Sequence, residues 1–322
     1  MKECRVAVIG VGYLGQFHAE KFAQLPEAHL VAVCDADRAR ADEIAAKYHV
    51  AAAYDYHELI GKVDAVSIVV PTSLHHEVTQ FFLSHNIHVL LEKPITRTVA
   101  EADDLIATAR AHNVILQIGH LERFNSAIVA LDNILDNPRF IECLRLAPFK
   151  PRVTDINVVL DLMIHDIEII QSIVKSPIKD IRANGAHVLS ESIDIANARI
   201  EFENGCVANV SASRVSFNTE RKIRIFQHDA YLSLDLHNKT LGIYRKGTSE
   251  MFPGIPDIIC DQQVFDQGDA LKAECKAFLS TILDNTPVLV TGEAGRAALA
   301  TAIDITRIVS AQLEAEPATA NA

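Results

Sequence analysis

The sequence predicts an α/β protein in two parts: an N-terminal doubly wound parallel sheet, then an α+β domain with an open, mostly antiparallel sheet. The chain has 322 residues, more than a single core of about 250–300 residues usually holds. Its first 120 residues alternate short apolar runs with longer helical patterns, and its second half carries β-hairpin signals. We therefore expect domains at residues 1–120 and 121–322, with the last helices free to pack back on the first domain.

The apolar runs of the first part predict β-strands that are buried on both faces. They are nearly continuous in Val, Ile and Leu, as in a parallel sheet covered by helices. The expected strands are CRVAVIG (4–10), HLVAVCD (29–35), VDAVSIVV (63–70), NIHVLLE (86–92) and VILQIG (114–119). The expected helices are 14–25, 36–49, 74–85 and 98–112. This alternation predicts a doubly wound sheet.

The second part begins with helical patterns and continues with antiparallel strands. Asn204 and Gly205 lie between two β-prone runs, and an Asn-Gly pair is a strong signal for a short hairpin. The runs KIRIFQ (222–227), AYLSLDL (230–236) and TLGIYRK (240–246) predict that a meander follows. Helices are expected at 124–136, 156–174, 268–285 and 292–313.

Composition excludes several classes of protein. Apolar residues make up 49% and charged residues 22% of the chain, as in ordinary globular proteins. The net charge of −12 argues against a nucleic-acid-binding or anionic-membrane-binding surface. No apolar run reaches the roughly 18 residues that a membrane span needs, and the opening MKECRVAVIG predicts a strand instead of a signal peptide. The six cysteines lack metal-like spacing, so we expect a reducing cytoplasm.

The stretch GVGYLG, which begins at Gly10, predicts a dinucleotide-binding turn. It directly follows an apolar strand and precedes a helix, and this context gives the G-x-G-x-x-G pattern its meaning. Gly10 permits the tight turn, Gly12 lets the backbone approach a pyrophosphate, and Gly15 lets helix and strand pack closely. The helix N-terminus supplies N–H groups to the phosphates. We therefore expect a Rossmann domain in which this turn, with Tyr13 and Leu14, binds the cofactor.

An acidic residue, Asp35, ends the second expected strand, twenty residues after Gly15. A carboxylate there accepts hydrogen bonds from both ribose hydroxyls and repels a 2′-phosphate, which favours NAD over NADP. Arg38 follows three residues later. Because its guanidinium is able to stack on adenine or to accommodate a phosphate, NADP remains the alternative cofactor.

Two further strand ends extend the predicted cofactor site. In a doubly wound sheet, ligands bind beyond the carboxyl ends of the strands, and both PTSLHH (71–76) and EKP (92–94) follow such ends. Lys93 is expected to project towards the nicotinamide end of the dinucleotide. A lysine on an exposed loop is the ordinary alternative, but it explains neither the location nor the proline that stiffens the turn.

Four motifs together resemble the glucose–fructose oxidoreductase/inositol dehydrogenase (Gfo/Idh/MocA) family. They are the GVGYLG turn, PTSLHH, the EKP triplet and a later D-x-x-x-H made by Asp161 and His165, and the resemblance covers nearly the whole chain. Members of that family pair a Rossmann domain with an open-sheet substrate domain. They oxidise or reduce sugars and polyols with a nicotinamide cofactor, and the resemblance implies the same for this chain.

The resemblance also implies roles for individual residues. The catalytic positions are Lys93, Asp161 and His165. The residues that line the cofactor, beyond the glycine turn, are Pro71, Thr72, His75, Glu92 and Lys93. Two positions depart from the family pattern: Ser73 stands where an Asn is common, which weakens the assignment of that loop, and Met163 stands where a Gly is common. The second departure is expected to reshape the floor of the pocket.

The catalytic trio also fits the chemistry of its side chains. On the expected helix, Asp161 and His165 are four residues apart and share a face. His165 titrates near neutral pH and can take the proton from a sugar hydroxyl as hydride leaves its carbon. Lys93 can hydrogen-bond the same oxygen and stabilise its alkoxide character, while Asp161 orients the substrate or the imidazole. Which of Lys93 and His165 is the formal base stays open.

His165 has two other interpretations. A histidine in an apolar helix is more often a satisfied core residue, but the presence of Asp161 and of the EKP triplet favours a catalytic one. Asp166 and Glu168 lie close by in sequence and suggest a metal site. No Cys/His spacing elsewhere supports a metal, and hydride transfer to a nicotinamide needs none, so we expect no metal.

The stretch GHLERFN (119–125) begins at a strand end, and its polar residues are expected to enter the substrate cleft. They are His120, Glu122, Arg123 and Asn125. With a basic APFKPR stretch and the DLMIHD helix, this stretch looks most like the family branch that oxidises the 3-hydroxyl of UDP-N-acetylglucosamine. A diphosphate needs cations, and the candidates are Arg145, Lys150, Arg152 and Arg214. For each of these, a solvated surface charge is the alternative.

Two other functions remain as alternatives to a nucleotide-sugar 3-dehydrogenase. One is a dehydrogenase of a free sugar or polyol of the inositol type. The other is a non-catalytic regulator that binds a dinucleotide, which the joint presence of Lys93, Asp161 and His165 disfavours. The open sheet leaves a broad face and edges that need covering. Together with the resemblance, this predicts a homo-oligomer, either a dimer or a tetramer, with no nucleic-acid or membrane partner.

Overall fold

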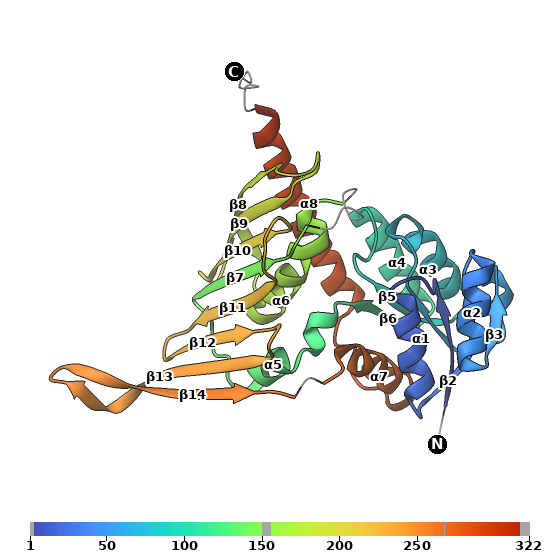
Figure 1. Cartoon of the computed structure of the whole chain (residues 1–322), viewed down its shortest axis with the longest axis horizontal. Coiled ribbons are helices and arrows are strands. Elements are labelled where there is room, and N and C mark those ends of the chain that lie inside the picture. Colours follow the sequence, from blue (N-terminus) through green and yellow to red (C-terminus); the bar gives the residue numbers. More distant parts are fainter. Residues whose placement is uncertain (1–2, 150–155, 267, 316–322) are drawn as a thin grey trace. The chain divides into compact units, whose positions relative to one another are not determined.

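The chain forms two structural units. The computed structural model describes residues 3–149, 156–266 and 268–315. The first unit comprises Met1–Phe124 with Asp269–Leu299, and the second comprises Asn125–Gly268 with Ala300–Ala322. One contains a six-stranded parallel sheet and the other an eight-stranded, mostly antiparallel sheet (Figure 1). The predicted fold class is confirmed.

The parallel sheet of the first unit has the strand order β3-β2-β1-β4-β5-β6. Its strands are β1 (Cys4–Ile9), β2 (Ala28–Cys34), β3 (Ala51–Ala53), β4 (Ala65–Ile68), β5 (His88–Glu92) and β6 (Leu116–Gly119). The helices and helical turns of this unit are α1 (Gly15–Gln24), α2 (Arg38–Tyr48), η1 (Tyr56–Leu59), η2 (Thr72–Leu74), α3 (His75–Ser84), α4 (Val99–Ala111), η3 (Leu121–Phe124) and α7 (Ala270–Asp284). The strand order reverses between β1 and β4, which makes the carboxyl ends of these strands the expected ligand-binding edge.

Local capping explains where two of these helices begin. Asp37 precedes α2, and its carboxylate accepts hydrogen bonds from the backbone N–H groups of the first turn. Thr98 and Glu101 form a reciprocal capping box at the start of α4. Such side chains satisfy N–H groups that have no partner within the helix, so both helix starts are encoded locally.

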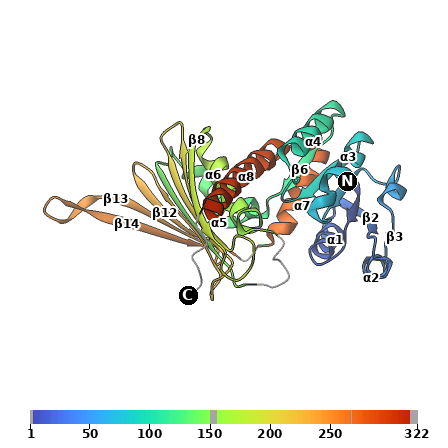
Figure 2. The same cartoon turned by 90° about the horizontal axis from the view of Figure 1, so that it is seen from above.

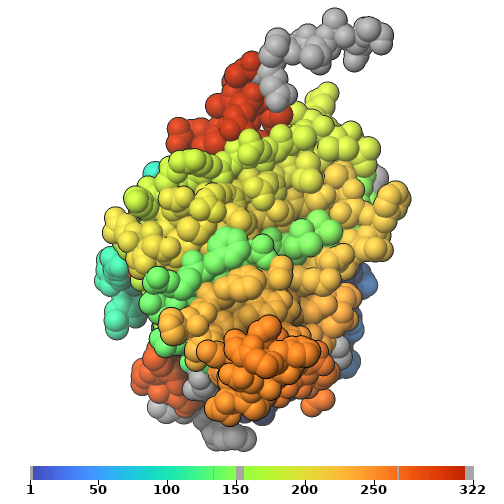
Figure 3. Space-filling model, turned by 90° about the vertical axis from the view of Figure 1, so that its left-hand side faces the viewer, coloured from blue at the N-terminus to red at the C-terminus, as the bar shows by residue number. Residues whose placement is uncertain are grey.

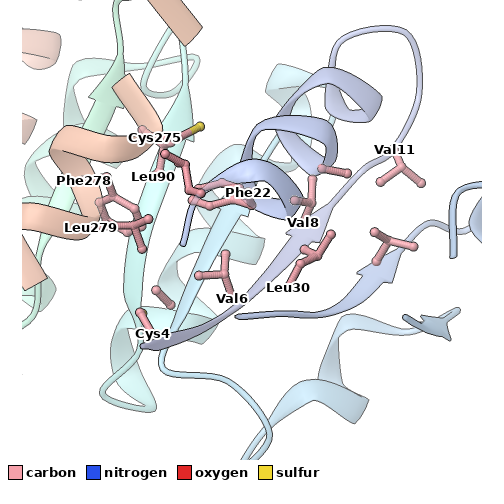
Figure 4. Packing of buried hydrophobic residues seen from close by; sticks show 14 of the residues in the cluster. Cys4, Val6, Val8, Val11, Phe22, Leu30, Leu90, Cys275, Phe278 and Leu279 are labelled. Carbon is pink, nitrogen blue, oxygen red and sulfur yellow. The ribbon is translucent and has the colours of Figure 1, made fainter. Parts of the chain in front are cut away.

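The core of the first unit joins segments from the two ends of the chain. Phe22 of α1 packs with Val8 of β1 and Leu90 of β5, and the side chains of Cys275 and Phe278 on α7 reach the same cluster (Figure 4). All five side chains are buried, with Phe22, Val8 and Phe278 fully inaccessible to solvent. Helix α7 therefore completes a hydrophobic core that the N-terminal strands begin.

The sheet of the second unit has the order β14-β13-β12-β11-β7-β10-β9-β8. Its strands are β7 (Phe140–Leu146), β8 (Ile178–Ala186), β9 (Ile195–Phe202), β10 (Val207–Ser213), β11 (Glu220–Phe226), β12 (Ala230–Asp235), β13 (Thr240–Phe252) and β14 (Ile255–Val264). Neighbouring strands are antiparallel except β7 and β10, which are parallel. Strands such as β7 and β12 alternate buried and more exposed residues, as expected of a sheet with one covered face.

One face of this second sheet carries helices. They are α6 (Ile164–Val174) and the part of α8 (Gly292–Ala315) that belongs to this unit (Figure 2). The opposite face is formed by the strands themselves, with β7 crossing its middle in green (Figure 3). No helix of the described segments is long and apolar enough to cross a membrane.

The Asn204–Gly205 hairpin is confirmed. Strands β9 and β10 pair antiparallel around it, and Gly205 has a φ of +85°, a left-handed conformation that glycine adopts readily. Four strands were missed by the sequence analysis, namely β3, β7, β8 and β14. The apolar run of the central strand β7 is interrupted by Glu142 and Arg145, and its place in the sheet depends on pairing with strands far along the chain.

The prediction of a helix at 124–136 is wrong. That segment forms only the short pieces η3, α5 (Ser126–Val129) and η4 (Ala130–Asn133). Gln227, at the end of β11, donates to the carbonyl oxygen of Ile134 at 3.2 Å and accepts from the N–H of Asp136 at 3.0 Å. Backbone groups that would extend a helix are thus bonded to a distant side chain.

Candidate active site

The carboxyl ends of the first unit's parallel strands gather most of the predicted cofactor residues at one edge. Gly10 follows β1, Asp35 follows β2, Pro71 lies shortly after β4, and Glu92 ends β5. Because the strands are parallel and in register, these residues lie at the same edge of the sheet.

The three glycines of the turn are required for different reasons. Gly10 has a φ of +83°, and a Cβ there would lie 2.5 Å from the carbonyl oxygen of Val69. A Cβ on Gly15 would overlap the carbonyl oxygen of Gly10. A Cβ on Gly12 would meet nothing within 4 Å, so internal packing does not require glycine at this position. The remaining reason for a glycine at position 12 is the close approach of a ligand to the backbone. The three glycines of the turn therefore fit a dinucleotide pyrophosphate.

The side chains of Tyr13 and Leu14 project from this turn, with 66% and 52% of their surface exposed. Large exposed apolar groups beside a phosphate-binding turn are well suited to cover a bound cofactor.

Asp35 is fixed by the turn that it faces. Its Oδ2 accepts the N–H of Val11 at 2.8 Å, and its Oδ1 accepts the N–H of Asp37 at 3.0 Å. Each carboxylate oxygen has a second lone pair, so the group still has capacity for ribose hydroxyls. The guanidinium of Arg38 stacks over the ring of Tyr54, 4.4 Å from its centroid, and is thereby held beside the same strand end.

Arg40 is part of this region and was missed by the sequence analysis. Its Nε donates to the carbonyl oxygen of Val11 at 2.8 Å, and it also pairs with Glu43 at 2.6 Å. Arg40, on α2, therefore stabilises the glycine turn. No local motif marks this contact, since the spacing between Val11 and Arg40 depends on how β2 returns the chain to the turn.

The EKP triplet forms a turn whose charged residues are partly buried. Glu92 Oε1 lies 3.2 Å from His18 Nε2, and Glu92 Oε2 accepts the N–H of Lys93 at 3.1 Å. The Lys93–Pro94 peptide bond is cis. His18 in turn contacts Ser67 Oγ through Nδ1 at 2.9 Å. Lys93 is half-buried instead of lying on an exposed loop.

His18 also escaped the sequence analysis, although a signal for it exists. It is three residues after Gly15 and four before Phe22, a helical spacing that places it on the buried face of α1. A polar side chain on an apolar helix face calls for a hydrogen-bond partner.

His75 connects the two strand-end loops. Its Nδ1 lies 2.7 Å from the carbonyl oxygen of Pro94, and its Nε2 lies 3.0 Å from that of Val70. Burial is the main cause that lowers the pKa of His75, only partly offset by these two carbonyl groups. Thr72 begins the short turn η2 just before His75, and Pro71 precedes it, so the PTSLHH loop is anchored at the EKP turn.

Several buried ionisable groups surround Glu92. Burial alone would raise the pKa of Glu92, but the hydrogen bond from His18 and the charges of His18 and Lys93 lower it. Burial, with the charge of Lys93 as a second cause, lowers the pKa of His120 to about 3, so this imidazole is neutral near pH 7. Burial and then the charge of Glu92 raise the pKa of Glu274, on α7, well above its usual range.

The remaining predicted residues of GHLERFN differ in burial. Glu122 is 8% exposed and Arg123 is half-buried, both in η3. Asn125 begins the second unit, where its side chain caps α5 by accepting the N–H of Ala127 at 3.1 Å and donates to the carbonyl oxygen of Leu236 at 2.9 Å. These bonds give Asn125 a structural role, and its contact with substrate stays a prediction.

In the second unit, Asp161 and His165 lie at the junction between a π-helical turn and an α-helix. Asp161 is in a π-helical turn, η6 (Val159–Met163), and His165 is in the first turn of α6. The side chain of Asn157 accepts the N–H groups of Val159 and Leu160, both at 3.0 Å, and so starts the turn. Single π-helical turns are frequent at functional sites, and both side chains are half-buried.

Two of the predicted phosphate-binding arginines are held in buried ion pairs. Arg145 makes two hydrogen bonds, of 2.9 and 2.8 Å, to the carboxylate of Asp166. Arg214 pairs with Asp194 at 2.7 Å and donates to Ser190 Oγ at 2.9 Å. Both arginines are about 5% exposed or less, an environment typical of structural cations.

Lys150 and Arg152 lie outside the described residues. Among the described residues, no group of three or more His, Cys, Asp or Glu side chains is arranged to hold a metal ion. Within the first unit, the structure brings together the glycine turn, Asp35, His75 and the EKP turn. Asp161 and His165 are brought together within the second unit.

Comparisons with known families match both units. Residues 4–120 match a family described as "Oxidoreductase family, NAD-binding Rossmann fold", and residues 148–233 match one described as "GFO/IDH/MocA C-terminal domain". The UDP-N-acetylglucosamine 3-dehydrogenase of Acidithiobacillus ferrooxidans is 41% identical over 315 residues, which cover 98% of this chain and 100% of that protein. A solved structure of that enzyme matches with a TM-score of 0.91 at 40% identity, over 97% of this chain and 100% of that one.

Inositol dehydrogenases are more distant relatives. The myo-inositol 2-dehydrogenase of Thermotoga maritima is 26% identical over 314 residues, covering 92% of this chain and 93% of that protein. The structure of a scyllo-inositol dehydrogenase from Lactobacillus casei matches with a TM-score of 0.80 at 21% identity, over 97% of this chain and 98% of that one. At that identity the match shows a shared fold.

The buried acid Glu274 makes stability depend on pH. Its side chain is inaccessible to solvent, and neither carboxyl oxygen has a hydrogen-bond partner among the described residues. With its pKa raised, the folded state keeps this proton above about pH 4.3, where the unfolded chain releases it. The folded state then binds more protons than the unfolded state, so stability falls as pH rises. Glu274→Gln should therefore raise the free energy of unfolding at about pH 8, and much less at about pH 5.

Urea unfolding at the two pH values measures this difference. Glu293→Gln is a suitable control, because burial of Glu293 is outweighed by hydrogen bonds from its own backbone N–H, Thr291 and Arg110, which lower its pKa. An equal effect of Glu274→Gln at both pH values would show that Glu274 is ionised in the folded state.

Proposed function

We propose that this chain, which belongs to the Gfo/Idh/MocA family of oxidoreductases, oxidises the 3-hydroxyl of a UDP-N-acetylhexosamine to a 3-keto nucleotide sugar, with NAD as cofactor. The observation that carries the proposal is the 41% identity to a UDP-N-acetylglucosamine 3-dehydrogenase across 98% of this chain. The first unit would bind the cofactor, and the second would bind the sugar and form the subunit contacts.

The first unit has suitable groups for NAD. The backbone around Gly12 is open to a pyrophosphate, the N-terminus of α1 supplies N–H groups, and Asp35 has lone pairs for the ribose hydroxyls. A bound nicotinamide accepts the hydride that leaves the sugar carbon. Tyr13, Leu14 and Thr72 would line the cofactor. Since Arg38 lies at the same strand end, the preference for NAD over NADP rests on the charge of Asp35.

Lys93, Asp161 and His165 would carry out the proton chemistry. Lys93 donates a hydrogen bond to the reacting hydroxyl oxygen and stabilises negative charge that develops on it. His165 accepts the hydroxyl proton, and Asp161 orients the imidazole or the sugar. Lys93 is itself a candidate for the formal base, so the assignment of that step between Lys93 and His165 is open.

The diphosphate of the substrate would need cations that are not already neutralised. Arg145 and Arg214 are buried with carboxylate partners, so Lys150 and Arg152, the other two candidates from the sequence, are proposed for this role. Arg123 stays among the proposed substrate-binding residues. His120 is neutral near pH 7 and would contribute a hydrogen bond instead of a charge. Glu122 and Asn125 complete the proposed substrate-binding set.

The open face of the second sheet supports a homo-oligomer, dimer or tetramer. Phe226, Tyr231 and Tyr244 form an aromatic row on three neighbouring strands, with ring centroids 4.8 and 5.1 Å apart. The guanidinium of Arg224 lies 5.4 and 5.3 Å from the rings of Phe226 and Tyr231. Aromatic residues and arginine are enriched in protein–protein interfaces, which makes this row the proposed centre of a subunit contact.

A cytoplasmic location is also proposed. All six cysteines are unpaired in the structure, and five of them are buried. Buried reduced thiols are typical of proteins from reducing compartments.

The substrate assignment is tested by incubating the protein with NAD and UDP-N-acetylglucosamine, with a 3-keto-sugar aminotransferase present to remove the product. NADH should form, and Lys93→Ala and His165→Ala should each lower kcat by about 10²–10⁴-fold, the usual contribution of a positioned proton-transfer group. Lys62→Ala and His228→Ala alter exposed residues and serve as matched controls. Turnover of free inositol or glucose without turnover of the nucleotide sugar would support the polyol alternative. Full function in a cell with Lys93→Ala would support a non-catalytic regulator.

The cofactor preference is tested with Asp35→Asn, which removes the charge and keeps an acceptor oxygen for the turn. Loss of the charge that repels a 2′-phosphate should raise the ratio of kcat/KM for NADP to that for NAD by about tenfold or more, equivalent to about 1.4 kcal/mol. Asp284→Asn, at an exposed helix end, controls for net charge. An unchanged ratio would mean that Asp35 does not face the 2′ position.

The subunit contact is tested by light scattering. The unmodified protein should have the mass of a dimer or tetramer. Ser233→Arg adds a charged side chain to the open face, since Ser233 points to the same side of β12 as Tyr231, and should dissociate the oligomer. Asn204→Asp, in the exposed hairpin turn, is the control. A monomeric unmodified protein at working concentration would contradict the proposal.

A further inference from the structure

The EKP turn is held by a buried histidine on each side. His18, from α1, contacts the carboxylate of Glu92, and His75, from the start of α3, contacts the carbonyl oxygen of Pro94. The two histidines are 2% and 1% exposed. Lys93 lies between Glu92 and Pro94, so contacts fix the backbone on both sides of it.

The contact between His18 and Glu92 has a defined donor and a defined acceptor. An ionised carboxylate only accepts hydrogen bonds, so His18 Nε2 carries the hydrogen that reaches Glu92 Oε1 at 3.2 Å. Nδ1 lies 2.9 Å from the hydroxyl of Ser67, which can donate to a neutral ring or accept from a protonated one. Ser67 is inaccessible to solvent on β4. The carboxylate of Glu92 thus requires the hydrogen on Nε2, and the Ser67 hydroxyl bonds the other ring nitrogen.

The surroundings of Glu92 keep its negative charge. The titratable groups that interact with it are His18 from α1, His75 from α3, Lys93 of its own turn, His120 after β6, and Glu274 and Cys275 from α7. Glu274 holds its proton and His120 is neutral near pH 7. A Cβ on Gly119 would lie only 3.2 Å from the carboxyl group of Glu92, so the end of β6 also confines this side chain.

On the other side, His75 joins two loops. Its ring nitrogens face the carbonyl oxygens of Pro94 and Val70 at 2.7 and 3.0 Å. A neutral imidazole has one N–H, and the shorter contact assigns it to Nδ1, donating to Pro94. In this tautomer Nε2 and the Val70 carbonyl oxygen are both acceptors, so the bond to Pro94 is the one by which His75 holds the EKP turn.

From this arrangement we infer that His18, bonded to Glu92 through Nε2 and to Ser67 through Nδ1, is a positioning residue for Lys93, and that His75 supports the same turn from the other side. The inference rests on the proposed role of Lys93 at the reacting hydroxyl. His18 has no part in proton transfer to the substrate. It holds the Glu92 carboxylate where Oε2 accepts the N–H of Lys93, and so fixes the point from which the lysine side chain starts.

Such positioning has kinetic consequences. A displacement of about 1 Å in a catalytic group can lower the rate by about 10²-fold, even when the altered residue is remote from the reaction. Loss of the His18 contact should therefore lower kcat while leaving the affinity for NAD nearly unchanged, because the glycine turn and Asp35 stay in place. Loss of a purely structural residue would instead lower thermal stability and leave kcat of the folded enzyme intact.

Three substitutions at His18 and one control test the inference. His18→Asn retains a polar group near Nδ1 but does not reach Glu92, His18→Phe retains bulk without a donor, and His18→Gln places an amide donor near the position of Nε2. We expect kcat to fall about 10–100-fold for Asn and Phe and less than about 5-fold for Gln, with the Kd for NAD changed less than about 2-fold in all three. The control is His88→Ala, at the opposite end of β5, where His88 Nδ1 accepts the N–H of Ile115 at 3.0 Å.

Hydrogen exchange of the protein without cofactor gives a readout that does not depend on the substrate. In His18→Asn, the amides of Lys93 and of residues 95–98 should exchange faster, while those of the glycine turn should not. A double-mutant cycle of His18→Asn with Glu92→Gln should show strongly non-additive losses in kcat. If the unmodified protein fails to oxidise UDP-N-acetylglucosamine, the proposed function fails, and the exchange data still decide the inference. Unchanged exchange at Lys93 and 95–98, or equal loss with Gln and Asn, overturns it.

Discussion

A largely buried carboxylate, that of Glu92, imposes a strict physical requirement on the first unit. A negative charge at the end of an apolar strand is unstable unless donors meet both of its oxygens. His18 and the N–H of Lys93 supply those donors, and each has to be held in place by further contacts. The hydrogen on His18 Nε2 is required by this charge, and the same charge adds to burial in raising the pKa of Glu274.

The location of the candidate cofactor site follows from the helices that cover both faces of the parallel sheet. Since helices bury both faces of the parallel strands, polar side chains have access to a ligand only where the strands end. The glycine turn, Asp35 and the EKP turn occupy three such ends, and the short contacts made by Arg40 and His75 join neighbouring ends to one another. The loops at this edge therefore behave as a connected set, although they are far apart in sequence.

Features that depend on neighbouring residues were predictable from the sequence. The turn from Gly10 to Gly15, the strand end at Asp35, the hairpin at Asn204 and the two C-terminal helices each carry a local pattern. Contacts that join distant segments were not predictable, and these include His18 with Glu92, Arg40 with Val11, and the central strand β7. The wrong prediction of a helix at 124–136 has the same cause, because the distant side chain of Gln227 forms hydrogen bonds with backbone groups of this segment. For Arg145 and Arg214, sequence identified the charge but not the buried carboxylates that neutralise it.

The contribution of α7 to the N-terminal core affects how the protein is made. On a ribosome, the strands and helices up to Phe124 emerge first, but Cys275 and Phe278 complete their core only after about 150 further residues. At about 5–20 residues per second, that delay is on the order of 10–30 s. During this time the surfaces of Phe22 and Leu90 that α7 covers have no native partner. The nascent chain thus presents an apolar surface for chaperones to bind until its C-terminal quarter is synthesised.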